Sequence, residues 1–551
     1  MENPLILDGI ILLIALYLIR KIQIRLRLSR AKHPSLAGHA KMSRRVARLV
    51  PFYEFSEDKL FSADGAPTNI AQQRKTAFER LAKQFRERSP NSVAMSESLE
   101  DSISDVLFTN NYRVPFQFRN YVKKHMKLGT IVDESHGAQV KDIDGNWSYD
   151  VAGSYGVNVF GYDFYKDCME KGFAKVKELG PVLGPYHPLI VENVQKLKTI
   201  SDKDEVSFHM SGTEAVMQAV RLARYHTRRS HLVRFCGSYH GWWDGVQPGI
   251  GNMRKTNDVY TLKEMDEDTK KVLRTRKDIA CVLVNPLQAM HINSNAPGDA
   301  MLVNSGRNAH FDRVAYTQWL QELREICTQR GIVLIFDEVF LGFRIAYGGA
   351  QEYFNVKADM VTYGKTLGGG LPVGVVCGKH HLMKRFKDDR PTDISFARGT
   401  FNSHPYVMGA MNEFLHRIEE PEIRASYEHN DEVWNNRVVQ LNSVLAENEL
   451  PVKVVNFSSV WTILYTVPSR YNWMFQYYLR AEGLSLSWIG SGRMIMSHNY
   501  TDEDFANVLQ RFVAAARAMK ADGWWWQDAG LSNKSIKKQL LREALASVFG
   551  K

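Results

Sequence analysis

The chain of 551 residues is too long for one compact core and predicts at least two domains, and its apolar fraction of 44% is sufficient for folding. The net charge of +11 comes mostly from one segment near the N-terminus that contains no Asp or Glu, which argues against a nucleic-acid groove across the body. Five widely spaced cysteines match no zinc or dithiol motif and indicate reduced, cytosolic thiols.

Residues 4–19 form an apolar run, interrupted only by Asp8 and Gly9, and the basic segment 20–48 follows at once. A cleaved secretory signal carries its positive charge before the apolar run, whereas here the charge comes after it. The pattern predicts an uncleaved, single-pass membrane anchor with its basic flank and the catalytic body on the cytoplasmic side. A helix over 4–19 spans about 24 Å against roughly 30 Å of hydrocarbon, so a helix lying on the membrane or packed on the body is the alternative.

The first sign of a ligand site is a predicted strand over 206–210 that runs into a predicted helix. Ser211, Gly212 and Thr213 open this helix, and the backbone amides of small residues at a helix start form a ready phosphate site. An ordinary helix cap explains these residues equally well.

Further apolar runs predict strands at 232–236 and 279–284, with a helix over 316–329. Alternating strands and helices predict a doubly wound α/β domain. Tyr239 follows the first of these strands, where its ring would either stack on a planar cofactor or pack in the core.

The central feature is an uninterrupted apolar strand over 332–336 that ends in Asp337 and Glu338. The next short apolar run, 360–363, leads within two residues to Lys365 and a glycine-rich loop. Ligands of such sheets gather at the carboxyl ends of the strands, so the acid and the amine are expected to meet there. Pyridoxal phosphate needs a lysine for its Schiff base and a carboxylate that keeps its ring nitrogen protonated. Alone, the two residues are explained as well by a loop lysine and a helix cap.

Motifs of other chemistries are missing from the sequence. It contains no P-loop, no dinucleotide fingerprint and no His-Glu pair at helical spacing, so no metal site is predicted.

In combination these signals resemble fold-type I pyridoxal-phosphate enzymes, specifically class III aminotransferases and most closely the glutamate-1-semialdehyde aminomutase branch. The resemblance extends from about residue 129 to about 516. It rests on five motifs in the order and spacing of the family: Ser211-Gly-Thr-Glu-Ala, Tyr239-His-Gly, Phe336-Asp-Glu-Val, Gly342-Phe-Arg and Gly364-Lys-Thr-Leu-Gly-Gly-Gly.

The resemblance implies a large domain with a mainly parallel seven-stranded sheet and helices on both faces, a smaller α+β domain, and a homodimer with shared active sites. Lys365 would form the Schiff base with pyridoxal 5'-phosphate, Asp337 would pair with the pyridine nitrogen, and Tyr239 would stack on the ring. The implied site comprises the catalytic Lys365, the cofactor-binding residues Gly212, Thr213, Tyr239, Asp337 and Thr400 (the last reaching the neighbouring subunit), and the substrate-side residues Ser154, Tyr155 and Asn285.

The predicted domain organisation has six parts. They are the anchor and basic flank (1–32), a linker with an accessory helical region (33–127), the N-terminal part of the small domain (128–185), the cofactor-binding large domain (186–420), the C-terminal small domain (421–520) and an amphipathic tail (521–551).

One departure from the family affects the predicted substrate. The family usually carries Glu-Pro where this chain has Asn285-Pro286, and an insertion-like stretch follows as far as Phe311. Loss of the acid changes the polarity beside the substrate. We therefore expect an aminotransferase that moves an amino group from an amino-acid donor to a carbonyl acceptor, and the anchor favours an acyl-chain or carrier-bound aldehyde or ketone of lipid or secondary-metabolite biosynthesis. The alternatives are an intramolecular aminomutase of the semialdehyde type and a non-catalytic scaffold of the same fold at the membrane.

Overall fold

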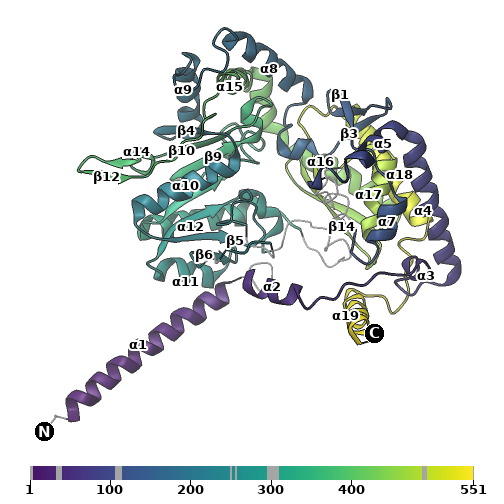
Figure 1. Cartoon of the computed structure of the whole chain (residues 1–551), viewed down its shortest axis with the longest axis horizontal. Coiled ribbons are helices and arrows are strands. Elements are labelled where there is room, and N and C mark those ends of the chain that lie inside the picture. Colours follow the sequence, from purple (N-terminus) through teal and green to yellow (C-terminus); the bar gives the residue numbers. More distant parts are fainter. Residues whose placement is uncertain are drawn as a thin grey trace.

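The computed structural model describes residues 4–32, 40–105, 114–247, 251–254, 257–293, 309–486 and 493–549. Within them a seven-stranded sheet in the order β4-β10-β9-β8-β7-β5-β6 forms the centre of the large domain (Figure 1). Its strands are β4 (Glu205–His209), β5 (His231–Phe235), β6 (Val259–Leu262), β7 (Ile279–Val284), β8 (Val333–Asp337), β9 (Met360–Gly364) and β10 (Gly374–Gly378).

The sheet is mixed because one strand runs against its neighbours. β10 is antiparallel to both β4 and β9, whereas the pairs among β9, β8, β7, β5 and β6 are parallel. The predicted seven-stranded, mainly parallel sheet is thus confirmed, and the carboxyl ends of β8 and β9 lie side by side at one edge.

Helices cover both faces of this sheet, as predicted. In β8, Val333 and Ile335 pack in the cluster that contains α10, while Leu334 and Phe336 pack in the main core. This alternation explains why the sequence of the strand is apolar without a break. The helices around the sheet are α8 (Tyr162–Val176), α9 (Leu189–Ser201), α10 (Gly212–Thr227), α11 (Glu267–Thr275), α12 (Arg313–Arg330), α13 (Gly349–Tyr353), α14 (His380–Met383) and α15 (Pro405–Arg417), and a hairpin of β11 (Phe386–Lys387) and β12 (Arg390–Ile394) extends from it.

The small domain is built from segments far apart in the sequence. One of its sheets has the order β13-β14-β16 and the other has the order β1-β2-β3-β15. The elements are β1 (Val132–His136), β2 (Gln139–Asp142), β3 (Trp147–Asp150), α16 (Pro421–Glu447), β13 (Val452–Phe457), β14 (Val460–Tyr465), α17 (Phe475–Ala481), β15 (Leu484–Ser485), β16 (Arg493–Ile495) and α18 (Asp502–Ala521).

The accessory helices pack into the core of this small domain. Phe78 and Leu81 of α4 share a buried cluster with Trp524, and Arg74 forms a fully buried ion pair of 2.7 Å with Asp64. The accessory part of the chain therefore completes a domain rather than linking two. Its helices are α3 (Glu57–Leu60), α4 (Thr68–Arg88), α5 (Pro90–Leu99) and α7 (Arg119–His125). Two further helices of the chain are α2 (Ala40–Ala47) and α19 (Asn533–Phe549).

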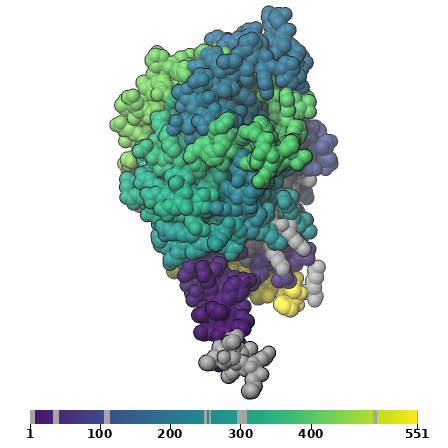
Figure 2. All heavy atoms as spheres, turned by 90° about the vertical axis from the view of Figure 1, so that its left-hand side faces the viewer, coloured from purple at the N-terminus to yellow at the C-terminus, as the bar shows by residue number. Residues whose placement is uncertain are grey.

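The N-terminal helix α1 (Pro4–Ala31) projects away from the body and touches it only near its C-terminal end (Figures 1 and 2). There Ala31 is fully buried, its carbonyl accepts from Lys263 N at 2.8 Å, and Leu28 packs on the main core.

The prediction that residues 4–19 span a membrane is wrong. No helix among the described residues is long and apolar enough to cross a bilayer. The apolar run contains Asp8 and is closed by Arg20 and Lys21, so it falls short of the roughly 20 uncharged residues that a span requires.

Candidate active site

Asp337 is the last residue of β8 and is 3% exposed at the carboxyl edge of the sheet. Its Oδ2 accepts from Nδ1 of His240 at 2.7 Å, since a carboxylate can only accept, and its Oδ1 accepts from Val339 N at 3.2 Å and from Oγ1 of Thr362 at 3.3 Å. Burial lowers the pKa of His240, so its ring is neutral and fixes the orientation of the carboxylate without neutralising it.

Lys365 follows β9 directly and begins the short turn η5 (Lys365–Gly368) with a φ of +47°. The left-handed backbone costs a non-glycine residue about 1 kcal/mol and marks a position where the surrounding structure imposes the geometry. Its Nζ donates to the carbonyl of Tyr155 at 2.7 Å and lies 5.3 Å from the ring centre of Phe340.

The amine of Lys365 is easier to deprotonate than an ordinary lysine. Its pKa is lowered to about 8, chiefly by burial; Asp337 opposes the shift, and the cations Arg344 and Arg493 add to it. A lysine with such a pKa carries far more free amine near neutral pH than an ordinary lysine does, and the free amine is the nucleophilic form.

The start of α10 lies close to this pair of residues. Ser211 caps the helix by accepting from Glu214 N, which leaves the amides of Gly212 and Thr213 at positions that no intrahelical carbonyl reaches. A Cβ on Gly212 would lie 2.5 Å from the side chain of Val339, and one on Gly241 would lie 2.4 Å from Oγ1 of Thr213. The helix start is thus packed between the turn after Asp337 and the turn after Tyr239.

Tyr239 and Asn285 meet at the same edge. The Tyr239 side chain is 59% exposed, so it is not a core residue, and its carbonyl accepts from Nδ2 of Asn285 at 2.9 Å. Oδ1 of Asn285 accepts from Leu287 N at the start of the turn η3 (Pro286–His291). Both polar atoms of the Asn285 side chain therefore form hydrogen bonds with the backbone, and the contact of Asn285 with the substrate remains a prediction.

Ser154 and Tyr155 lie in the turn η2 (Gly153–Gly156), with φ values of +44° and +58°. Oγ of Ser154 lies 2.9 Å from the hydroxyl of Tyr162, which donates to Asp150 at 2.6 Å. The turn is thus held in an uncommon conformation that presents the Tyr155 carbonyl to Lys365.

Arg344 joins this turn to both domains. Its guanidinium donates to Oγ of Ser459 at 2.8 Å and to the carbonyls of Met496 (2.7 Å), Asn158 (3.1 Å) and Gly156 (3.4 Å). The side chain is fully buried, and all of these acceptors are neutral. A residue from the large domain therefore fixes the position of the η2 turn against the small domain.

Thr400 is the last of the predicted cofactor-binding residues. It is exposed on the segment between β12 and α15, so its contact with the phosphate in a neighbouring subunit remains a prediction.

Sequence reasoning missed two residues of the site. His240 and Arg344 were visible only as members of the motifs Tyr239-His-Gly and Gly342-Phe-Arg, without a partner that would suggest a role. Glu338 stands beside Asp337 in the sequence but accepts from Ala350 N on the opposite side, and burial raises its pKa to about 8. Successive strand residues point to opposite faces, which separates the two acids.

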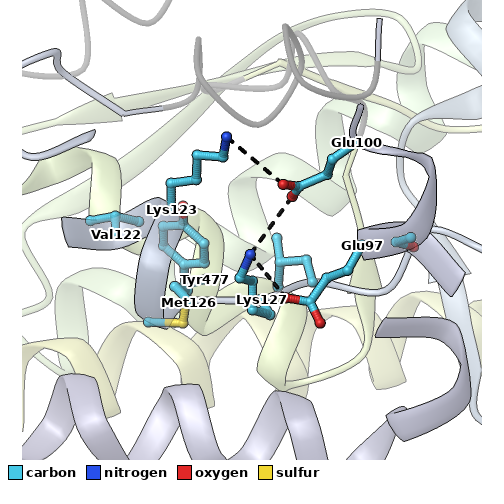
Figure 3. A pocket seen from close by; sticks show the side chains of 9 residues that line it. Glu97, Glu100, Val122, Lys123, Met126, Lys127 and Tyr477 are labelled. Atoms are coloured by element: carbon cyan, nitrogen blue, oxygen red, sulfur yellow. Dashed lines mark ion pairs between the residues drawn. The ribbon is translucent and has the colours of Figure 1, made fainter. Parts of the chain in front are cut away.

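A hollow between α5 and α7 lies in the accessory region and shares no residue with this site (Figure 3). Its charges are paired internally, because Lys127 lies 2.9 Å from Glu97 and Lys123 lies 3.8 Å from Glu100. It offers no unpaired group for chemistry.

The residues at the sheet edge fit pyridoxal phosphate. Lys365 supplies an amine whose pKa is lowered, and Asp337 supplies an oriented carboxylate for the ring nitrogen. The amides of Gly212 and Thr213 form an anion site for the phosphate, and Tyr239 offers an exposed ring for stacking.

Comparison with known proteins identifies the family. The model of aminotransferase class-III matches residues 121–516, and the chain therefore belongs to this family of pyridoxal-phosphate enzymes. The predicted family, enzyme class and cofactor are all confirmed.

Two curated relatives illustrate the similarity. The glutamate-1-semialdehyde 2,1-aminomutase of Alkaliphilus oremlandii is 29% identical over 415 residues, which are 71% of this chain and 91% of the relative. The enzyme of the same name from Methanocaldococcus jannaschii is 31% identical over 351 residues, covering 61% of this chain and 76% of the relative.

Solved structures agree with the fold. A transaminase with PLP bound superimposes with a TM-score of 0.61 at 25% identity, over 72% of this chain and 92% of its own. A glutamate-1-semialdehyde aminomutase from Pseudomonas aeruginosa in complex with PMP gives 0.65 at 18% identity, over 81% and 98%, which supports the fold alone.

Proposed function

We propose that the protein is an aminotransferase that takes an amino group from an amino-acid donor and passes it to a separate carbonyl acceptor. The observation that carries this proposal is the arrangement of Lys365 and Asp337 at the carboxyl ends of neighbouring strands, with the lysine pKa lowered to about 8. A non-catalytic scaffold, the alternative from a different class, would have no use for an amine and a carboxylate arranged in this way.

Each residue has a defined part in this chemistry. When bound, pyridoxal phosphate supplies the aldehyde and the electron-withdrawing ring. Nζ of Lys365 would hold the aldehyde of the cofactor, and as a free amine it would take up a proton as general base and return it as general acid. Asp337, oriented by His240, would hold the proton on the ring nitrogen, and the start of α10 would hold the phosphate.

The aminomutase alternative is favoured by the names of the curated relatives, and a donor-dependence assay separates it from the proposal. The holoenzyme is mixed with single amines, and the visible absorption of the cofactor is followed. Conversion of the cofactor by an amino acid, with product formed only when a second carbonyl compound is added, supports the aminotransferase. Turnover of glutamate-1-semialdehyde alone, without an external donor, favours the aminomutase.

We further propose that the enzyme is a homodimer in which Thr400 of one subunit reaches the phosphate of the other. Thr400 is exposed in the single chain, as this arrangement requires. Analytical sedimentation would show a dimer. Thr400→Val would weaken the retention of the cofactor while the protein remains a dimer.

We also propose that α1 binds the surface of an anionic membrane. The apolar residues of its N-terminal part are exposed within the described chain, and the basic residues that follow match acidic headgroups. Exposed fractions between 49% and 68% are found for Ile10, Ile11, Leu12, Leu13, Ile14, Leu16, Tyr17, Leu18 and Ile19.

Deletion of residues 1–22 tests this proposal and keeps Leu28 and Ala31, which dock α1 on the body. We expect the full-length protein to sediment with vesicles that contain phosphatidylserine, and less with neutral vesicles. The truncated protein should stay in the supernatant and keep its turnover within about twofold, because no residue of the site lies in α1. Equal sedimentation of both proteins would contradict the proposal.

A membrane location would bring the enzyme to lipid-soluble acceptors, and we propose an acyl-chain or carrier-bound aldehyde or ketone as the acceptor. A series of aldehydes of increasing chain length tests this. A kcat/KM that rises with chain length supports the proposal, and one that is flat or falls contradicts it.

A further inference from the structure

We propose that the C-terminal helix α19 and the segment after α2 form a second contact with the anionic membrane, an inference that rests on the membrane binding proposed for α1. In both views of the molecule α1 and α19 lie on the same side of the body, and α2 lies between them in Figure 1 (Figures 1 and 2). The apolar surface of this second contact, which we call the basal face, consists of Leu49, Val50, Phe52, Leu541, Leu545, Val548 and Phe549, whose exposed fractions lie between 48% and 79%.

One face of α19 is fixed to the body. Ile536 is buried, and Nε2 of Gln539 donates to the Ala63 carbonyl at 2.7 Å. The guanidinium of Arg470 donates to both carboxylate oxygens of Glu543 at 2.8 and 2.9 Å. Positions three and four apart share a side of a helix, so these contacts hold α19 by one side and leave the opposite side outward.

The outward side of α19 is apolar toward its C-terminal end. Leu541, Leu545, Val548 and Phe549 follow one another at the i, i+4, i+7, i+8 spacing of a helix face that packs on an apolar surface. All four side chains are exposed among the described residues. A contiguous apolar stripe on a docked helix marks an interaction surface.

The segment after α2 extends this stripe. The hydroxyl of Tyr53 donates to Oε2 of Glu543 at 3.2 Å, across 490 residues of sequence. The exposed side chains of Leu49, Val50 and Phe52 come directly before Tyr53 and therefore adjoin α19.

The charges around the basal face favour lipid over a second copy of the chain. Residues 9–53 contain no Asp or Glu, and Glu543, which pairs with Arg470, is the only acid of α19. In a symmetric dimer formed through this face the same bases would oppose one another, whereas anionic headgroups match them. The bases are Lys41, Arg44, Arg45, Arg48, Lys534, Lys537, Lys538 and Arg542.

Two contacts have a consequence that one helix lacks. α1 joins the body only near Leu28 and Ala31, so a protein bound through α1 alone can pivot there. The basal face is small and engages the membrane once α1 has brought it to the surface, because its binding is then intramolecular. It fixes the orientation of the body and tightens the attachment.

The first experiment reports whether α19 meets lipid. All five native cysteines are buried, so Phe549→Cys can be labelled selectively with an environment-sensitive fluorophore on the full-length holoenzyme. On vesicles that contain phosphatidylserine its emission should shift to shorter wavelength and rise at least about twofold. Val191→Cys on α9 is the matched control, because Val191 is 72% exposed; its emission should not change.

The second experiment measures affinity by sedimentation with the same vesicles. Leu545→Gln/Phe549→Gln removes apolar surface without changing the charge, and the lipid concentration for half-maximal binding should rise about tenfold. The control Val191→Gln/Val439→Gln changes two exposed valines of α9 and α16 and should bind like the wild type. Turnover should equal that of the wild type in both variants, because none of these residues belongs to the active site.

The outcomes separate the inference from the α1 proposal beneath it. If the wild type binds the vesicles while the label at position 549 does not respond and the Gln variant binds equally well, the inference is wrong and the α1 proposal stands. If the wild type does not bind, both are overturned. A shift that grows with protein concentration in the absence of vesicles would assign the basal face to a second copy and also contradict the inference.

Discussion

The two halves of the active site differ in how they are built. The large-domain half consists of residues at strand ends and a helix start, and each lies within a short motif. The small-domain half consists of the η2 turn and the acceptors of Arg344, which come from segments hundreds of residues apart. The first half holds the groups that we propose perform the chemistry, and the second half positions them.

Replacement of Lys365 should have the largest effect of any single change, since it removes the nucleophile of the large-domain half. We expect Lys365→Ala to lower turnover at least about a thousandfold and to abolish the visible absorption band of the bound cofactor. Far-ultraviolet circular dichroism should be unchanged. A variant that retained the band would refute the cofactor assignment.

Asp337→Asn should cause the second-largest loss of turnover. The amide cannot hold the proton on the ring nitrogen, so turnover should fall by about a hundredfold, while the cofactor still binds through Lys365 and the helix start. Steady-state kinetics and the retained absorption band measure both effects. His240→Phe should produce a smaller loss in the same direction, because it removes only the partner that orients Asp337.

Arg344→Met tests the positioning half. Loss of its four hydrogen bonds should lower turnover about tenfold and destabilise the protein by about 3 kcal/mol, because buried acceptors are left unpaired. Thermal unfolding and kcat at saturating donor would show the two losses. If turnover fell as much as in Lys365→Ala, the division between chemical and positioning halves would be wrong.

Glu338→Gln should have the smallest effect on activity and a distinct effect on stability. Because burial raises the pKa of Glu338 to about 8, the folded protein holds a proton that the unfolded chain releases above its ordinary value of 4.5. The contribution of this group to stability is therefore present at low pH and is lost as pH rises through about 8. Glu338→Gln should keep turnover within about threefold and flatten this decline, which denaturant unfolding at several pH values would show.

The N-terminal helix shows where sequence reasoning failed. The apolar run and the basic flank were visible in the sequence, and the helix exists. The span was overestimated because Asp8, Arg20 and Lys21 enclose too short an apolar stretch. The docking of its other end on the body, through Leu28 and through the bond from Lys263 N to the Ala31 carbonyl, had no signal, since such contacts join distant segments.

The sequence by itself determined the fold class, the enzyme class and the cofactor, through a family resemblance that five short motifs carry. Each motif is a local pattern, such as a strand buried on both faces or a helix that starts with small residues, and is therefore visible along the chain. The tertiary structure decided the rest. Only packing shows that Asp337 pairs with His240, that Glu338 turns away and that Arg344 joins two domains, because partners are chosen by proximity in space and not by spacing along the chain.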